Sequence, residues 1–265
     1  MEEGMTYLAA VFVFIFGSVI GSFLNVLIWR LPRGESIIFP GSHCPKCNHP
    51  IAFYDNIPIV SYIILGGRCR HCGERISLRY PLVEGLCALG FLFAFWYSGF
   101  SFSLGFFKSI YLFSSLVAIS FIDIDKRIIP EALTLPGIAV GLLFSLFEHD
   151  ILNSLIGIFV GGGILLCFGF IGGVMFKKES MGFGDVELMA FIGAFLGWQK
   201  SILVVILAAF FAVLLGGGLL LLKSRKRKVD DHYIPFGPYI SLAAVIACFY
   251  GQVMVDFYIN SFFPA

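Results

Sequence analysis

Apolar residues fill long stretches of this chain, and short polar segments separate them. A bilayer core about 30 Å thick is crossed by about 20 apolar residues in an α-helix. Eight stretches reach or approach this length, at about residues 6–28, 82–99, 103–122, 132–147, 151–175, 185–199, 201–222 and 236–258. The pattern predicts an all-α polytopic membrane protein with about eight transmembrane helices.

The only long polar piece of the chain divides the predicted helices into two groups. We expect three parts: a first transmembrane helix over 1–28, a loop domain over 29–81 and a seven-helix core over 82–265. The first stretch differs from a cleaved signal peptide, because Glu2 and Glu3 precede it and its apolar run is too long. We therefore interpret it as a retained membrane helix.

Composition and the placement of charge support a membrane location and set the orientation. Hydrophobic residues make up 58% of the chain, charged residues 13%, and the mean hydropathy is +0.92. With both termini outside, 16 of the 18 Lys and Arg residues fall in the cytoplasmic segments 29–81, 123–131, 176–184 and 223–235. Only Lys108 and Lys200 fall on the other side, so the positive-inside rule places the loop domain in the cytoplasm. We interpret the basic run 223–228 as an anchor beside anionic lipid.

Four of the seven cysteines form two Cys-x-x-Cys pairs in the loop domain. Cys44 and Cys47 are separated by 21 residues from Cys69 and Cys72, a spacing typical of a four-cysteine zinc site, although slightly wide. Two disulfides are the alternative, but they are rare in a reducing compartment. Zinc with a structural role is expected, and an iron–sulfur or rubredoxin-like iron site is a competitor. The other cysteines are interpreted as small apolar residues.

Carboxylates at the ends of predicted membrane helices are candidates for function, because ionisable groups are costly there. Asp123 ends one helix and Asp185 begins another, 62 residues later, and both lie on the cytoplasmic side. Two facing carboxylates can share a proton and activate one water for hydrolysis. A proton or cation pathway also uses membrane carboxylates, so the residues alone leave both possibilities open.

Several motifs, in order along nearly the whole chain, resemble those of the type IV leader peptidases, also called prepilin peptidases. The first group is Gly21-Ser22-Phe23-Leu24-Asn25-Val26 with Arg30-Leu31-Pro32, followed by the two cysteine pairs with Asn56-Ile57-Pro58 between them. The second group is Arg79-Tyr80-Pro81-Leu82-Val83-Glu84, Asp123-Ile124-Asp125, Gly182-Phe183-Gly184-Asp185 and Ile234-Pro235-Phe236-Gly237-Pro238.

The resemblance implies an aspartic membrane peptidase of the Gly-x-Gly-Asp type. By position in the motifs, the catalytic pair is Asp123 and Asp185, and the nearest rivals are Asp125 and Glu187. Gly182 and Gly184 would shape the site, and Glu84, Asp125 and Glu187 are candidates for attracting a basic leader.

The resemblance also implies substrates and a second activity. Such enzymes cleave the cytoplasmic leader of type IV prepilins and type II secretion pseudopilins after Gly, at the bacterial inner membrane. Members with a cysteine-bearing loop also methylate the new N-terminus with S-adenosylmethionine, which we expect here. No nucleic-acid partner is expected, and the oligomeric state is left open. The alternative is a carboxylate-based membrane transporter or proton channel with a zinc loop.

Overall fold

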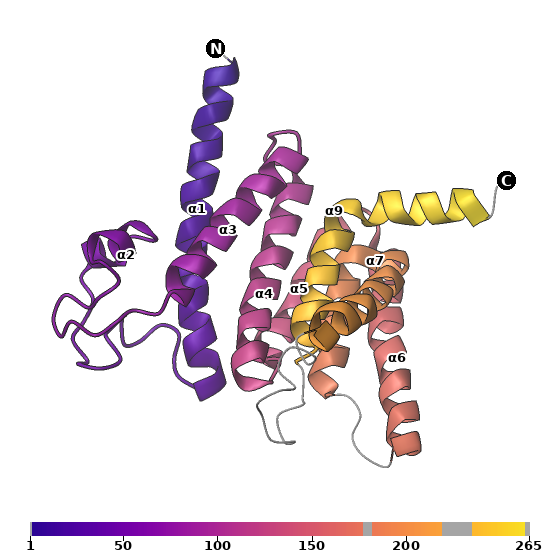
Figure 1. Ribbon diagram of the computed structural model, residues 1–265. Helices are drawn as coiled ribbons and strands as arrows, with labels where there is room; N and C mark the ends of the chain where they lie inside the picture. Colours follow the sequence, from indigo (N-terminus) through magenta and orange to yellow (C-terminus); the bar gives the residue numbers. More distant parts are fainter. Residues whose placement is uncertain (1, 177–181, 219–234, 263–265) are drawn as a thin grey trace. The chain divides into compact units, whose positions relative to one another are not determined.

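The computed structural model describes residues 2–176, 182–218 and 235–262. The basic run 223–228 and the basic pair Lys177–Lys178 lie outside these ranges. The elements in chain order are α1 (Glu2–Arg30), η1 (Leu31–Arg33), η2 (Phe53–Asn56), α2 (Val60–Ile64), α3 (Arg79–Tyr97), α4 (Leu104–Lys126), α5 (Glu131–Phe147), α6 (Ile151–Phe176), α7 (Phe183–Phe211), η3 (Ala212–Gly217) and α9 (Gly237–Phe262). Within the described ranges these are helices only, which confirms the all-α fold class (Figure 1).

Six of the described helices are long and apolar enough to cross a membrane, and α5 is a shorter apolar helix. The expected helices over 185–199 and 201–222 correspond to the two parts of α7, with η3 continuing the second part. Gly197 interrupts α7 with a non-helical backbone (φ 78°, ψ 177°). The Asn153 side chain fills this break, because its Oδ1 accepts a hydrogen bond from the Trp198 N–H at 3.2 Å. A glycine and a polar partner thus divide α7 close to the point where the apolar pattern predicts one helix to end and the next to begin.

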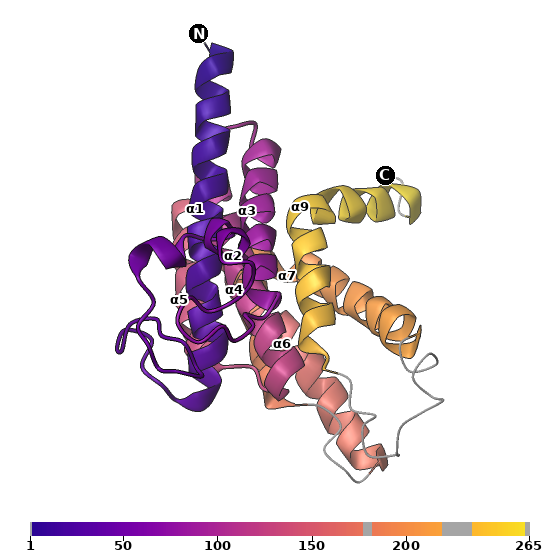
Figure 2. The same cartoon turned by 60° about the vertical axis from the view of Figure 1, so that its left-hand side comes forward.

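The chain folds as two compact units, residues 1–118 and 119–265, whose boundary falls within α4. In the first unit α1 packs along α3, as Figure 2 shows. The approach is close because α1 carries two glycines one turn apart. A Cβ at Gly21 would lie 2.6 Å from the Glu84 Cα, and one at Gly17 would lie 2.8 Å from the Cys87 carbonyl oxygen. The Gly-x-x-x-Gly spacing therefore serves helix packing.

In the second unit α7 packs closely on α6, and α5 and α9 also contact α7. Gly157 of α6 and Gly193 of α7 meet backbone to backbone, so a Cβ on either residue would overlap the other helix. This crossing places the start of α7, which carries Asp185, at a fixed point in the unit.

A pair of glycines on α6 tests this packing. A Cβ at Gly161 would lie 2.6 Å from the Met189 carbonyl oxygen, whereas no atom lies within 4 Å of a Cβ at Gly163. We expect Gly161→Ala to destabilise the protein by about 1–3 kcal/mol through overpacking. Gly163→Ala should be neutral or slightly stabilising, because alanine favours helices. Thermal unfolding in detergent measures both variants, and equal melting temperatures would contradict the packing described.

Candidate functional site

Asp123 lies near the end of α4 with its side chain buried at 5% exposure. Its Oδ2 accepts a hydrogen bond of 2.9 Å from the backbone N–H of Gly237, the first residue of α9. Asp125, only two residues further along, is exposed. The two neighbouring aspartates therefore have different environments, and Asp123 is the one that faces the interior of the second unit.

Asp185 lies in the first turn of α7 and is partly buried. Its backbone N–H donates to the Gly182 carbonyl oxygen at 3.1 Å, which closes the turn before the helix. The charge of its carboxyl group interacts with that of Asp123, in the same unit. The second unit thus contains both carboxyl groups, and their charges interact, which the sequence alone could not establish.

The two glycines before Asp185 differ in their surroundings. A Cβ at Gly184 would lie 2.9 Å from the Ile129 Cβ, so glycine lets the segment before α5 approach closely. A Cβ at Gly182 would lie 3.7 Å from Asp185 Oδ2, which is ordinary contact. The steric requirement for glycine therefore falls on Gly184.

Glu187, the other acidic residue at the start of α7, is held by a neighbouring helix. Thr134 of α5 is fully buried, and its hydroxyl donates to Glu187 Oε2 at 3.1 Å. The Glu187 carboxylate thus has a polar partner within its own unit and helps to fix α7 against α5.

The four cysteines of the loop domain lie together in the first unit, with all Sγ atoms within 4.8 Å of one another. Cys44 Sγ and Cys72 Sγ are 3.8 Å apart, close to the separation expected of two sulfurs about 2.3 Å from one tetrahedral ion. All four are free thiols. The cluster therefore fits a metal ion, and four protein ligands would leave no open position on it.

Each cysteine pair is held by the same backbone turn. The first cysteine of each pair donates its N–H to the carbonyl oxygen five residues later, at 3.0 and 2.8 Å. Its own carbonyl oxygen accepts the N–H of the residue after the second cysteine, at 2.9 and 3.0 Å. That residue, Asn48 or Gly73, has a left-handed backbone with φ of 56° or 70°. Asparagine and glycine tolerate this conformation, so the local sequence favours both turns.

The four neighbouring thiols of the cysteine cluster affect one another's pKa values. Hydrogen bonds from the backbone N–H groups of Cys72 and His71 lower the pKa of Cys69 to about 7. The Glu74 N–H lowers the pKa of Cys72, but desolvation and the adjacent thiols outweigh it and raise that pKa to about 12. Four thiolates cannot all be charged without a cation among them, and metal binding would remove this repulsion.

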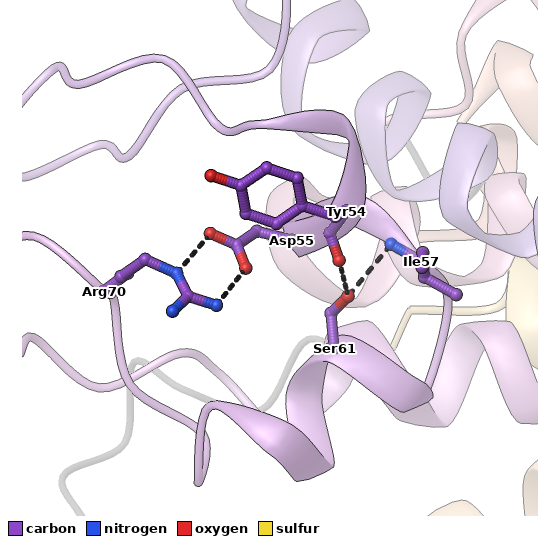
Figure 3. Close-up of polar contacts among 5 residues, drawn as sticks. All are labelled: Tyr54, Asp55, Ile57, Ser61 and Arg70. Atoms are coloured by element: carbon purple, nitrogen blue, oxygen red, sulfur yellow. Dashed lines mark hydrogen bonds and ion pairs between the residues drawn. The ribbon is translucent and has the colours of Figure 1, made fainter.

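An ion pair ties the second cysteine turn to the rest of the loop, as Figure 3 shows. Arg70 donates to both carboxylate oxygens of Asp55 at 2.6 and 2.7 Å. These hydrogen bonds lower the pKa of Asp55, so the pair adds stability above the usual carboxyl pKa and loses it as pH falls through the lowered value. Ser61 continues the connection, because its hydroxyl donates to the Tyr54 carbonyl oxygen and accepts the Ile57 N–H.

Glu84 of α3 holds a strained turn in the same loop. Ile59 has a left-handed φ of 63°, which is unfavourable for a β-branched residue, and the Val60 N–H reaches back to the Pro58 carbonyl oxygen at 2.6 Å. The buried Glu84 carboxylate accepts the Ile59 N–H at 2.7 Å and a hydrogen bond from Ser22. The acidic group proposed for leader attraction therefore anchors the loop to α3 and α1.

Six long apolar helices define a multi-pass membrane protein, and comparison with known proteins identifies its family. Residues 15–98 match the bacterial peptidase A24 N-terminal domain, and residues 110–217 match the type IV leader peptidase family. The chain belongs to the type IV leader peptidase family, which confirms the resemblance seen in the sequence.

Two of three relatives match nearly the whole chain, and the third matches about three quarters of it. A prepilin leader peptidase/N-methyltransferase of Aeromonas hydrophila is 36% identical over 99% of this chain and 98% of that protein. One of Pseudomonas aeruginosa is 32% identical over 93% of the chain and 92% of that protein. One of Myxococcus xanthus is 42% identical over 74% of the chain, and the match covers 58% of that protein. No solved structure matches the chain.

Metal analysis tests the four-cysteine cluster. We expect about one metal ion per purified chain, and Cys72→Ser should lower this content severalfold, because one ligand is lost. Cys167→Ser is the matched control, since Cys167 lies on α6, outside the cluster. Elemental analysis of the purified variants measures the change. A metal-free wild-type protein, or equal metal content in the two variants, would refute the site.

Proposed function

We propose that this protein is a membrane aspartic endopeptidase that removes the leader of type IV prepilins and type II pseudopilins after Gly. Family membership and the names of the relatives confirm an enzyme with peptidase and N-methyltransferase activity. The observation that carries the choice of catalytic residues is the pairing of Asp123 with Asp185 inside one unit, while Asp125 is exposed.

The two carboxyl groups can carry out hydrolysis without a covalent intermediate. One carboxylate takes a proton from a water, whose oxygen attacks the carbonyl carbon of the scissile bond. The other, protonated, polarises the carbonyl oxygen and its proton goes to the leaving nitrogen as the C–N bond breaks. Two carboxyl groups in close proximity share one proton readily, because both cannot be ionised at low cost. Asp123 and Asp185 supply this pair.

The proposed location of the reaction is the cytoplasmic face of the bacterial inner membrane. A prepilin has a basic leader in the cytoplasm and an apolar helix in the bilayer, so its scissile bond lies near the inner face. Asp123 lies in the last turn of α4 and Asp185 in the first turn of α7, and these positions at helix ends support the proposed location. The basic residues that follow α1 and α4 support the orientation under the positive-inside rule.

The four-cysteine cluster is proposed to hold Zn²⁺ in a structural role, with the loop domain 29–81 serving the second activity. The four sulfurs fit this ion, and the loop contacts α3 through Glu84. S-adenosylmethionine is the proposed methyl donor and would supply the methyl group for the new N-terminal amine.

The transporter or proton-channel alternative also places carboxylates at a membrane boundary. Family membership favours the peptidase, because the matched family is defined by leader cleavage. Ion flux in proteoliposomes without cleavage of a prepilin would reverse this choice.

Aspartate-to-asparagine variants test the catalytic pair. We expect Asp123→Asn and Asp185→Asn each to lower kcat for prepilin cleavage by at least about 1000-fold, because general acid–base catalysis supplies roughly 100- to 10,000-fold per group. Asp125→Asn is the matched control, since this exposed neighbour should retain cleavage within about threefold. The assay measures leader release by mass, and methylation of a pre-cleaved pilin reports that each variant is folded.

Full cleavage by either Asp123→Asn or Asp185→Asn would disprove the assignment. If Asp125→Asn is inactive and Asp123→Asn is active, Asp125 and not Asp123 is the catalytic partner of Asp185.

The glycines before Asp185 provide a further test. We expect Gly184→Ala to slow cleavage at least tenfold, because its Cβ would push against Ile129 and shift the start of α7. Gly182→Ala should stay within about threefold of wild type, since its Cβ makes only ordinary contact. Cleavage rates of the two variants under saturating prepilin measure the difference, and equal rates would argue against this steric role.

A further inference from the structure

The first residue of α9 has a backbone donor that the helix itself does not use. Helix N-termini leave their first N–H groups without intrahelical acceptors. The helix closes from the Phe236 carbonyl oxygen, which accepts the N–H groups of Tyr239 at 3.1 Å and Ile240 at 3.2 Å. Pro238 has no N–H. The Gly237 N–H is therefore available, and it donates to Asp123 Oδ2 at 2.9 Å.

Position 237 also has no room for a side chain. A Cβ there would lie 2.7 Å from Asp123 Oδ2 and 3.2 Å from its Cγ. Gly237 is buried, and so is Asp123, so neither group can move aside into solvent. Glycine at this position lets the backbone touch the carboxylate directly.

We propose that Gly237 is a positioning residue for the peptidase reaction: its N–H fixes Oδ2 of Asp123 and thereby aims Oδ1 at the water or the scissile bond. Among the described residues this N–H is the one hydrogen-bond donor to the Asp123 carboxylate. Without it the carboxyl group rotates about its Cβ–Cγ bond and samples orientations that do not support proton transfer. The inference rests on the proposed catalytic role of Asp123.

An ester at position 237 tests the loss of the Gly237 N–H hydrogen bond without the steric effect of an added side chain. Glycolic acid in place of Gly237, introduced by nonsense suppression into the full chain, removes the N–H and adds no atom at Cα. It removes no intrahelical donor, because this N–H has no acceptor in α9, although the Phe236 carbonyl becomes a weaker ester acceptor for the Tyr239 and Ile240 N–H groups. Lactic acid in place of Ala132 is the matched control, since Ala132 also lies in the first turn of its helix, α5.

For the Gly237 ester we expect kcat for prepilin cleavage to fall about 10- to 100-fold, the range for a lost hydrogen bond to a charged group. KM should change less than about twofold, and methylation of a pre-cleaved pilin should be unchanged. The Ala132 ester should match wild type in all three. Gly237→Ala should lose at least as much kcat as the ester, because its Cβ displaces the carboxylate.

A wild-type kcat in the Gly237 ester, with Asp123→Asn inactive, would overturn the positioning role and leave the proposed function intact. Full cleavage by Asp123→Asn would overturn the proposed function itself. An equal loss of cleavage and methylation in the Gly237 ester would also overturn the proposal, since a positioning role at Asp123 affects cleavage alone.

Discussion

A carboxyl group among apolar helices is costly unless polar groups meet it, and this constraint organises the second unit. Asp123 obtains its hydrogen bond from the start of α9, 114 residues away in the chain. Glu187 obtains one from a buried threonine on α5. Glycines allow these approaches, at position 237 for α9 and at position 184 for the segment before α5. The contacts that lower the free-energy cost of burying the carboxyl groups also hold these groups in a defined arrangement. A proton-transfer reaction needs such an arrangement.

The first unit is also organised by polar contacts, and in addition by a cluster of sulfur atoms. Its loop domain has little apolar core of its own, so it relies on a sulfur cluster that fits a metal ion and on polar connections. The Arg70–Asp55 pair links one cysteine turn to η2, and Glu84 of α3 holds the strained turn at Ile59. Because Glu84 also lies against Gly21 of α1, the loop is attached where the two helices pack most closely. The arrangement connects the metal cluster to the membrane helices of its own unit.

Much of this architecture could be predicted from the sequence. Long apolar runs predicted helices, and the spacing of four cysteines predicted a cluster, because both depend on local sequence. The apolar pattern also predicts a helix boundary between 185–199 and 201–222, close to the break at Gly197, but it does not show that Asn153 supports this break. The contact between Gly237 and Asp123 cannot be predicted from the Ile234–Pro238 motif, because no local pattern encodes a hydrogen bond between residues so far apart in the chain. Likewise the sequence makes Glu84 a candidate for attracting a basic leader, and only the fold shows its partners in Ile59 and Ser22.

Leader cleavage and methylation of the product are proposed to be joined in this one chain. The most direct test incubates the purified wild-type protein with a full-length prepilin and isotopically labelled S-adenosylmethionine, and measures the mass of the pilin. We expect a pilin that has lost its leader at a Gly and gained one labelled methyl group at its new N-terminus. A prepilin of unchanged mass, under conditions in which a relative cleaves it, would contradict the proposed function.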